Sequence, residues 1–111
     1  MRTVSMLLFE GFSNLCLANA VEPLRAANML SRRTLYAWTF RGLDSGTLTS
    51  SSGLAVQPKL LSHDCSGAAL FVMPSYGHAA LATPDCLCRL RAAARRFDLL
   101  VGLDTGSWLL A

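Results

Sequence analysis

Apolar positions follow two different spacings along the chain. Four runs, at residues 3–9, 35–40, 68–73 and 98–103, are almost continuously apolar or rich in aromatics, as is typical of strands in a buried sheet. Between them, apolar residues recur every three or four positions, which predicts helices after residue 13 and after residue 83. The order strand, helix, strand, loop, strand, helix, strand predicts an open parallel sheet with helices on both faces. We expect the first strand at its centre.

Local residues indicate where the two helices begin. Ser13 can cap the first helix, but Pro23 inside it lacks a backbone donor and is expected to kink or interrupt it. Thr83, Pro84 and Asp85 have the N-cap, first-position and first-turn chemistry of a second helix. Residues 44–67 form mostly connection, with one short strand at 54–56. The predicted core positions are Leu17, Ala20, Val21, Leu24 and Ala27 near the first helix and Leu87, Leu90, Ala94 and Phe97 near the second.

The last residues, 108–111, have the pattern of a helix that has only begun, with no C-terminal signal after it. We therefore expect the natural protein to continue beyond Ala111, and Leu109 and Leu110 to be exposed in this segment.

Composition narrows the class of protein. The 111 residues suit one domain or part of one, and 52% hydrophobic against 15% charged residues excludes a disordered chain. The apolar runs are too short to cross a bilayer, so we expect a cytoplasmic protein without membrane contact. The four cysteines include a Cys86-x-Cys88 pair, whose members point in different directions on a helix, so we predict packed, reduced thiols and no metal site.

The formal net charge of +3 is carried largely by four arginines near the second helix. Their position suits the negative end of the helix dipole and a solvated face. Because no aromatic residues are interleaved, we expect no nucleic-acid contact from that segment. These four are Arg89, Arg91, Arg95 and Arg96.

Ligands of open parallel sheets bind at the carboxyl ends of the strands, which points to residues 10–11, 74–78 and 102–107. The third segment, Gly-Leu-Asp-Thr-Gly, has the form of a strand-to-helix elbow that exposes its central residue, Asp104. Asp104 can simply cap the following helix. A covalent carboxylate nucleophile needs a paired histidine, and neither His63 nor His78 has an evident pairing. The Asp-Thr-Gly-Ser match to aspartic proteases is a coincidence, because that motif belongs to an all-β fold.

Five segments of the chain carry a resemblance to a known family: LFEGFS at 8–13, VEPLRAAN at 21–28, LYAW at 35–38, SSGL at 51–54 and LDTGSWLLA at 103–111. With them the whole chain resembles the sensor domains of AraC-type transcriptional regulators, which belong to the PfpI, or class I glutamine amidotransferase-like, superfamily. The resemblance implies a flavodoxin-like sheet, incomplete at its C-terminal end. It also implies that residues 1–111 form the N-terminal part of the sensor domain, with the helix-turn-helix DNA-binding domain outside them, in a protein that acts as a homodimer.

Three departures from the enzymes of this superfamily affect the predicted activity. Their elbow cysteine corresponds to Asp104, their supporting carboxylate falls near Cys16, and their glycine-rich turn corresponds to a segment with Ser75 and Tyr76. We therefore expect a domain that binds a small-molecule effector without catalysis and without a cofactor. The alternative is a PfpI-like hydrolase or lyase with an atypical aspartate at the elbow.

The resemblance also implies an effector class, because members with an Asp-Thr-Gly elbow look like those that respond to quaternary amines. Asp104 and a nearby Tyr76 would supply charge and a π face for such a cation. The predicted ligand-binding residues are Glu10, Gly11, Tyr76, Gly77, Asp104 and Thr105.

Overall fold

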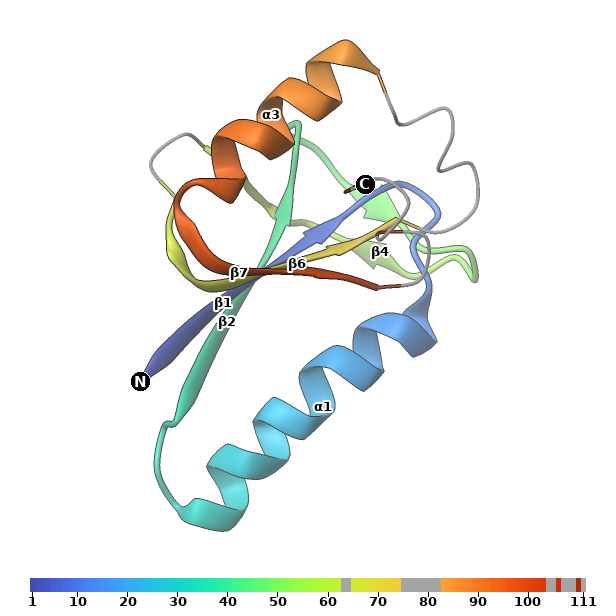
Figure 1. Ribbon diagram of the computed structural model, residues 1–111. Helices are drawn as coiled ribbons and strands as arrows, with labels where there is room; N and C mark the ends of the chain where they lie inside the picture. The colour runs from blue at the N-terminus through green and yellow to red at the C-terminus, as the bar shows by residue number, and fades with distance from the viewer. Residues whose placement is uncertain (63–64, 75–82, 104–105, 107–109, 111) are drawn as a thin grey trace.

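The computed structural model describes residues 1–62, 65–74, 83–103, 106 and 110. Five strands form one parallel sheet in the order β5-β2-β1-β6-β7 (Figure 1). The central strand is the first of the chain, as predicted. The strands are β1 (Arg2–Leu8), β2 (Tyr36–Gly42), β5 (Lys59–Leu60), β6 (Gly67–Met73) and β7 (Phe97–Gly102).

Two helices cover opposite faces of this sheet (Figure 1). Helix α1 (Asn14–Ser31) packs on the face that carries Val4, Met6 and Leu8, and helix α3 (Pro84–Ala94) packs on the face that carries Leu7. Successive side chains of a strand point to opposite faces, which explains why Met6, Leu7 and Leu8 of β1 are apolar in succession. The predicted flavodoxin-like architecture is therefore confirmed.

Helix α1 begins where the sequence predicts it. The Ser13 hydroxyl accepts a hydrogen bond from the Cys16 amide at 3.2 Å. The expected interruption at Pro23 was wrong, because α1 continues without a break from Asn14 to Ser31. Pro23 lies on an exposed part of the helix, where water can solvate the carbonyl that the proline leaves without a donor.

In helix α3 the predicted cap is confirmed, but the buried face differs from the predicted one. Thr83 accepts a hydrogen bond from the Cys86 amide at 3.2 Å, and Pro84 occupies the first turn. The buried positions are Cys86, Leu90 and Ala93, whereas Ala94 is only half-buried because the helix ends there. The Cys-x-Cys pair diverges as predicted, although the exposed Cys88 is not a packed thiol.

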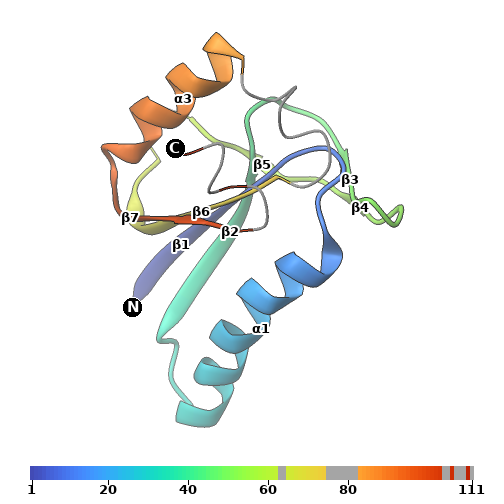
Figure 2. The same cartoon turned by 45° about the vertical axis from the view of Figure 1, so that its right-hand side comes forward.

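The connection after β2 contains more structure than expected. The predicted short strand is β4 (Ala55–Val56), which pairs antiparallel with β3 (Leu48–Thr49) in a hairpin beside the main sheet (Figure 2).

Leu110 packs partly buried against the core on the α3 side, contrary to the expectation that it is exposed. Among the helices that the structure describes, none is both long and apolar enough to span a membrane.

Candidate functional site

The turn after β1 is built from a glycine in a conformation that other residues rarely adopt. Phe12 donates its amide to the Phe9 carbonyl at 3.1 Å, and Gly11 between them has φ +80°. The Gly11 amide donates to the Thr49 carbonyl at 2.8 Å, and the Glu10 carboxylate accepts from the Thr49 amide at 3.1 Å. The turn is thus bonded to the β3–β4 hairpin and holds Glu10, which is exposed, at the carboxyl edge of the sheet.

A cleft of about 300 Å³ opens beside this turn. Its walls are the end of β1, the loop between β2 and β3, and the start of α3, so it lies where parallel sheets bind ligands. The volume falls at the lower end of the range for small-molecule sites. It is lined by Leu8, Phe9, Glu10, residues 43–48, Thr83, Asp85, Cys86 and Arg89.

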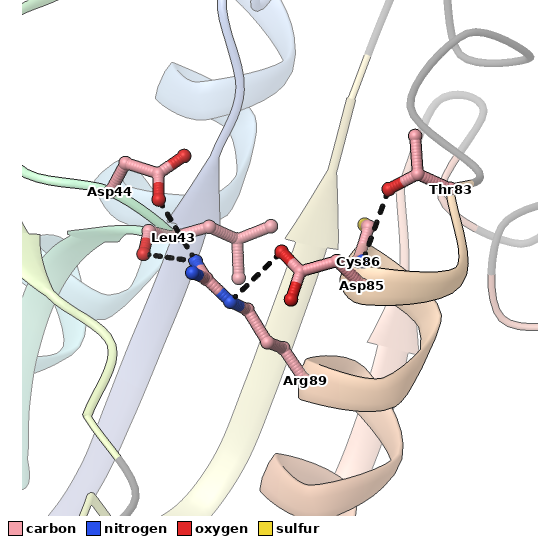
Figure 3. Close-up of polar contacts among 6 residues, drawn as sticks. All are labelled: Leu43, Asp44, Thr83, Asp85, Cys86 and Arg89. Atoms are coloured by element: carbon pink, nitrogen blue, oxygen red, sulfur yellow. Dashed lines mark hydrogen bonds and ion pairs between the residues drawn. The ribbon is translucent and has the colours of Figure 1, made fainter.

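Arg89 connects α3 to the loop after β2 across this cleft (Figure 3). Its Nη1 donates to the Leu43 carbonyl at 2.6 Å and to Asp44 Oδ1 at 3.0 Å, and its Nε lies 3.3 Å from Asp85 Oδ2. The hydrogen bond with Asp44, and then the charge of Asp85, raise the pKa of Arg89 above its ordinary value. The guanidinium is therefore a permanent cation that crosslinks two walls of the cleft.

Cys86 lies in the same wall, one turn from Arg89 along α3. Burial raises the pKa of this thiol above its ordinary value of 9.0, and the negative charge of Asp85 adds to the effect, outweighing the opposite influence of Arg89. Cys86 is therefore protonated at neutral pH and packs as an apolar side chain.

Leu103 and Gly106, on either side of the predicted elbow residues, lie against the end of β6. The Leu103 amide donates to the Val72 carbonyl at 3.0 Å, and the Gly106 amide donates to the Leu103 carbonyl at 2.8 Å. A Cβ atom on Gly106 would overlap the Val72 carbonyl oxygen. A residue larger than glycine therefore does not fit at position 106 without a shift of the backbone.

The register of the strands brings the predicted turns to one edge. Leu8 of β1 pairs with Met73 of β6, and Val72 of β6 pairs with Gly102 of β7, so the three strands end side by side. Glu10 and Gly11 lie at this edge, as predicted. The other predicted ligand-binding residues, Tyr76, Gly77, Asp104 and Thr105, lie outside the described residues.

Glu10 is the one predicted site residue among the described residues that line the cleft. The charged and capping residues Asp44, Thr83, Asp85 and Arg89 are among those missed from the sequence. The sequence pattern assigned Thr83 only to helix capping, Asp85 only to the helix dipole and Arg89 only to the end of the helix dipole and a solvated face. Asp44 carried a usable signal, because it lies two residues after the end of β2 and so near a carboxyl strand end.

A second hollow lies on the α1 side of the sheet. It is larger, about 590 Å³, and mainly apolar, and its walls are α1 with Phe71 and Leu103. The first turn of α1, which contains Cys16, has no acidic residue.

No protein-family model matches the chain. It is, however, 35% identical over 111 residues to the HTH-type transcriptional regulator GbdR of Pseudomonas aeruginosa, an alignment that covers 99% of this chain and 30% of that protein. It is 37% identical over 106 residues to the HTH-type transcriptional regulator CdhR of the same species, covering 95% of this chain and 31% of that protein. The chain is a homologue of these regulators. It spans about 30% of their length.

Solved structures agree with this assignment. An AraC family transcriptional regulator from Pseudomonas putida superposes with a TM-score of 0.78 at 29% identity, over 99% of this chain and 69% of that one. A ThiJ/PfpI family protein from Pseudomonas syringae superposes with a TM-score of 0.73 at 21% identity, over 98% of this chain and 44% of that one. This chain therefore has the ThiJ/PfpI fold.

Proposed function

We propose that the chain is the ligand-sensing domain of an AraC-type transcriptional regulator and binds a small metabolite without transforming it. The observation that carries this proposal is the similarity of almost the whole chain to HTH-type regulators. The cleft at the carboxyl edge supplies a place for the effector. DNA is contacted by a helix-turn-helix domain outside these residues, and the complete protein acts in the cytoplasm as a homodimer.

The charges of the cleft favour a small organic cation, such as a quaternary amine, as the effector. Glu10, Asp44 and Asp85 contribute three negative charges and Arg89 one positive charge, so the cleft carries a formal charge of −3 + 1 = −2. Arg89 is already paired with both aspartates, which leaves Glu10 as the carboxylate without a cationic partner among the described residues.

We propose that the other predicted ligand-binding residues also belong to this site. Asp104 adds a further negative charge at the elbow, and Tyr76 offers an aromatic face to the cation, an interaction of about 0.5–2 kcal/mol. Gly77 and Thr105 lie beside them in the sequence, in the segments that follow β6 and β7.

Calorimetric titration of the complete protein tests the effector class. We expect choline and trimethylglycine to bind, and 3,3-dimethylbutanol, an uncharged analogue of choline with the same shape, to bind at least tenfold more weakly. Glu10→Gln keeps a hydrogen-bond acceptor for Thr49 but removes the charge, and we expect it to weaken cation binding. Asp98→Asn, an exposed acidic position at the opposite edge of the sheet, is the matched control. Equal affinity for choline and its neutral analogue would exclude charge recognition.

Two substitutions at Asp104 separate ligand binding from helix capping. If Asp104 only caps the last helix, Asp104→Asn retains stability and effector affinity, and Asp104→Ala costs about 0.5–2 kcal/mol of stability. If its charge meets the effector, the asparagine variant folds normally but binds the cation weakly. Unchanged affinity in the folded asparagine variant would remove Asp104 from the site.

The regulatory part of the proposal is tested on DNA. We expect the complete protein to select a two-fold symmetric site from a random-sequence library and to sediment as a dimer, because symmetric sites are read by symmetric dimers. An effector that binds the cleft should change the affinity for that site. Failure to select any DNA sequence would overturn the assignment as a transcriptional regulator.

A further inference from the structure

Five arginines that are far apart in the sequence lie at the amino edge of the sheet, opposite the cleft. Arg2 begins β1, Arg32 and Arg33 precede β2, and Arg95 and Arg96 precede β7. All of them are exposed except the half-buried Arg96. Figures 1 and 2 show the three segments on the same side of the molecule, with the N-terminus between the last turn of α1 and the start of β7.

These arginines form no ion pairs with the acidic residues that the structure describes. The ion pairs recorded within residues 1–62, 65–74 and 83–103 involve Arg25 and Arg89 only. Among the acidic residues in those ranges, Asp98 is the one that lies on this edge. Among the described residues, the amino edge therefore carries five positive charges against one negative, while the residues that line the cleft carry a net negative charge.

The backbone that presents these charges is held firmly. The Asn28 side chain accepts from the Leu35 amide at 2.8 Å and donates to the Tyr36 carbonyl at 2.9 Å, which fixes the turn containing Arg32 and Arg33. Arg96 donates to the Ser62 carbonyl at 3.3 Å. A charged surface on fixed turns loses little entropy when it binds a partner.

Helix stability alone does not account for this cluster. Arg32, Arg33 and Arg95 lie at or next to helix C-termini, where a cation offsets the helix dipole. Arg2 lies at the start of a strand and has no such role. Its presence completes a row that runs from β2 across β1 to β7.

The strand starts next to the arginines are spaced over a length comparable to a short stretch of duplex DNA. The first residues of β2 and β7 are three strand spacings apart, about 14 Å at about 4.8 Å per spacing. That is about four base pairs of duplex, a stretch that displays about eight phosphate charges at one per 1.7 Å of helix axis. Several arginines of the row can therefore meet phosphates at the same time.

We propose that this amino edge, which we call the arginine edge (Arg2, Arg32, Arg33, Arg95 and Arg96), contacts the phosphate backbone of DNA in the complete regulator. The inference rests on the proposed function, because it presumes that a helix-turn-helix domain brings the sensor domain close to a duplex. It assigns the sensor domain a sequence-independent share of the DNA contacts, in addition to its effector site. The proposal departs from the expectation that Arg95 and Arg96 make no nucleic-acid contact. That expectation rested on the lack of interleaved aromatic residues, which stack on bases but are not needed for contacts with phosphates.

Salt dependence of DNA binding tests the arginine edge. The complete protein is titrated with a fluorescein-labelled 40-base-pair duplex of random sequence, and anisotropy is followed from 50 to 300 mM NaCl. The edge variant Arg2→Gln/Arg95→Gln removes two exposed charges from different segments. The control variant Arg25→Gln/Lys59→Gln removes two exposed charges from the middle of α1 and from β5.

Each phosphate contact contributes about −0.9 to the slope of log K against log salt. We expect the edge variant to lose about 1.8 from the slope and to bind about 60-fold more weakly at 100 mM salt, with the two lines converging near 1 M. The control variant should keep the wild-type slope. Circular dichroism melting of all three proteins reports any loss of helix stability separately.

Three results would overturn the inference. Equal slopes for the edge and control variants, with wild-type DNA binding intact, would contradict the arginine edge while leaving the regulator function in place. A lower melting temperature of the edge variant with an unchanged slope would assign the arginines to helix stability. A wild-type protein that binds no duplex at any salt concentration, or binds only vesicles of anionic phospholipid, would overturn the regulator function as well.

Discussion

We predict that replacing Gly106, which follows β7, with alanine destabilises the protein. A Cβ atom there would overlap the Val72 carbonyl oxygen, and that oxygen already accepts the Leu103 amide at 3.0 Å. A backbone carbonyl in the middle of the sheet cannot rotate aside as a side chain could. Gly106→Ala must therefore displace the elbow from β6 or distort the end of the strand.

The magnitude follows from two contributions. Overpacking in a fixed environment costs about 1–3 kcal/mol, and weakening the hydrogen bond between Leu103 and Val72 adds about 0.5–1.5 kcal/mol. We expect the free energy of unfolding to fall by about 2–4 kcal/mol on these grounds. Urea unfolding followed by tryptophan fluorescence measures the change, since Trp38 packs against the core on the α1 side.

Gly53 provides the matched control. It has φ +94° with no atom within 4 Å of an added Cβ, so its requirement is conformational and not steric. Gly53→Ala should cost about 1–2 kcal/mol, and Gly53→Asn should recover part of that loss because asparagine tolerates the left-handed region. Gly106→Asn should recover nothing. If Gly106→Ala costs no more than Gly53→Ala and asparagine improves both positions, the steric account of the elbow is wrong.

Further predictions concern the burial of side chains on α1 and α3, the two cysteines of α3, and Arg89. Leu90→Ala should destabilise by about 2–5 kcal/mol because the side chain is buried in the core, whereas Leu15→Ala, at an exposed position, should change stability by less than about 0.5 kcal/mol; similar effects in urea unfolding would contradict the assigned burial. A maleimide reagent at pH 7.5 should modify the exposed Cys88 and spare Cys86, as mass spectrometry of peptides can show. Because the folded pKa of Cys86 is raised, its contribution to stability is complete below pH 9.0 and is lost as the pH rises further; a Cys86→Ala variant should lack that alkaline loss. Arg89→Gln should change effector affinity more than the unfolding midpoint, since the pairs it breaks are largely exposed.

The sequence was sufficient for the long elements because each carries its own periodic pattern. The continuous apolar runs identified β1 and β6 to within a residue or two, and Ser13 and Thr83 marked the starts of both helices. Two-residue strands such as β3 and β5 have no periodicity to detect. Their pairing depends on contacts that form only after the sheet has assembled.

Charged residues were predicted less well than apolar ones, because a pattern can place a residue on a face but cannot show its partner. Arg89 was assigned to a solvated face, yet it is half-buried, and its contact with Asp44 joins residues 45 positions apart. The arginine edge could not be predicted from the sequence for the same reason. Its members lie in segments that are distant in the sequence and become neighbours because parallel strands start at the same edge.

The polarity of a parallel sheet also explains why the two surfaces differ in charge. Helix N-termini lie at the carboxyl edge of the strands, where they attract acidic side chains such as Asp85, and helix C-termini lie at the amino edge, where they favour cations such as Arg95. Helix α3 joins the two edges directly, since its first turn lines the cleft and its C-cap belongs to the arginine edge. Its 11 residues span about 16 Å at about 1.5 Å per residue. A displacement of α3 as one body, such as release of Arg89 from the loop after β2, would therefore move charges at both edges together.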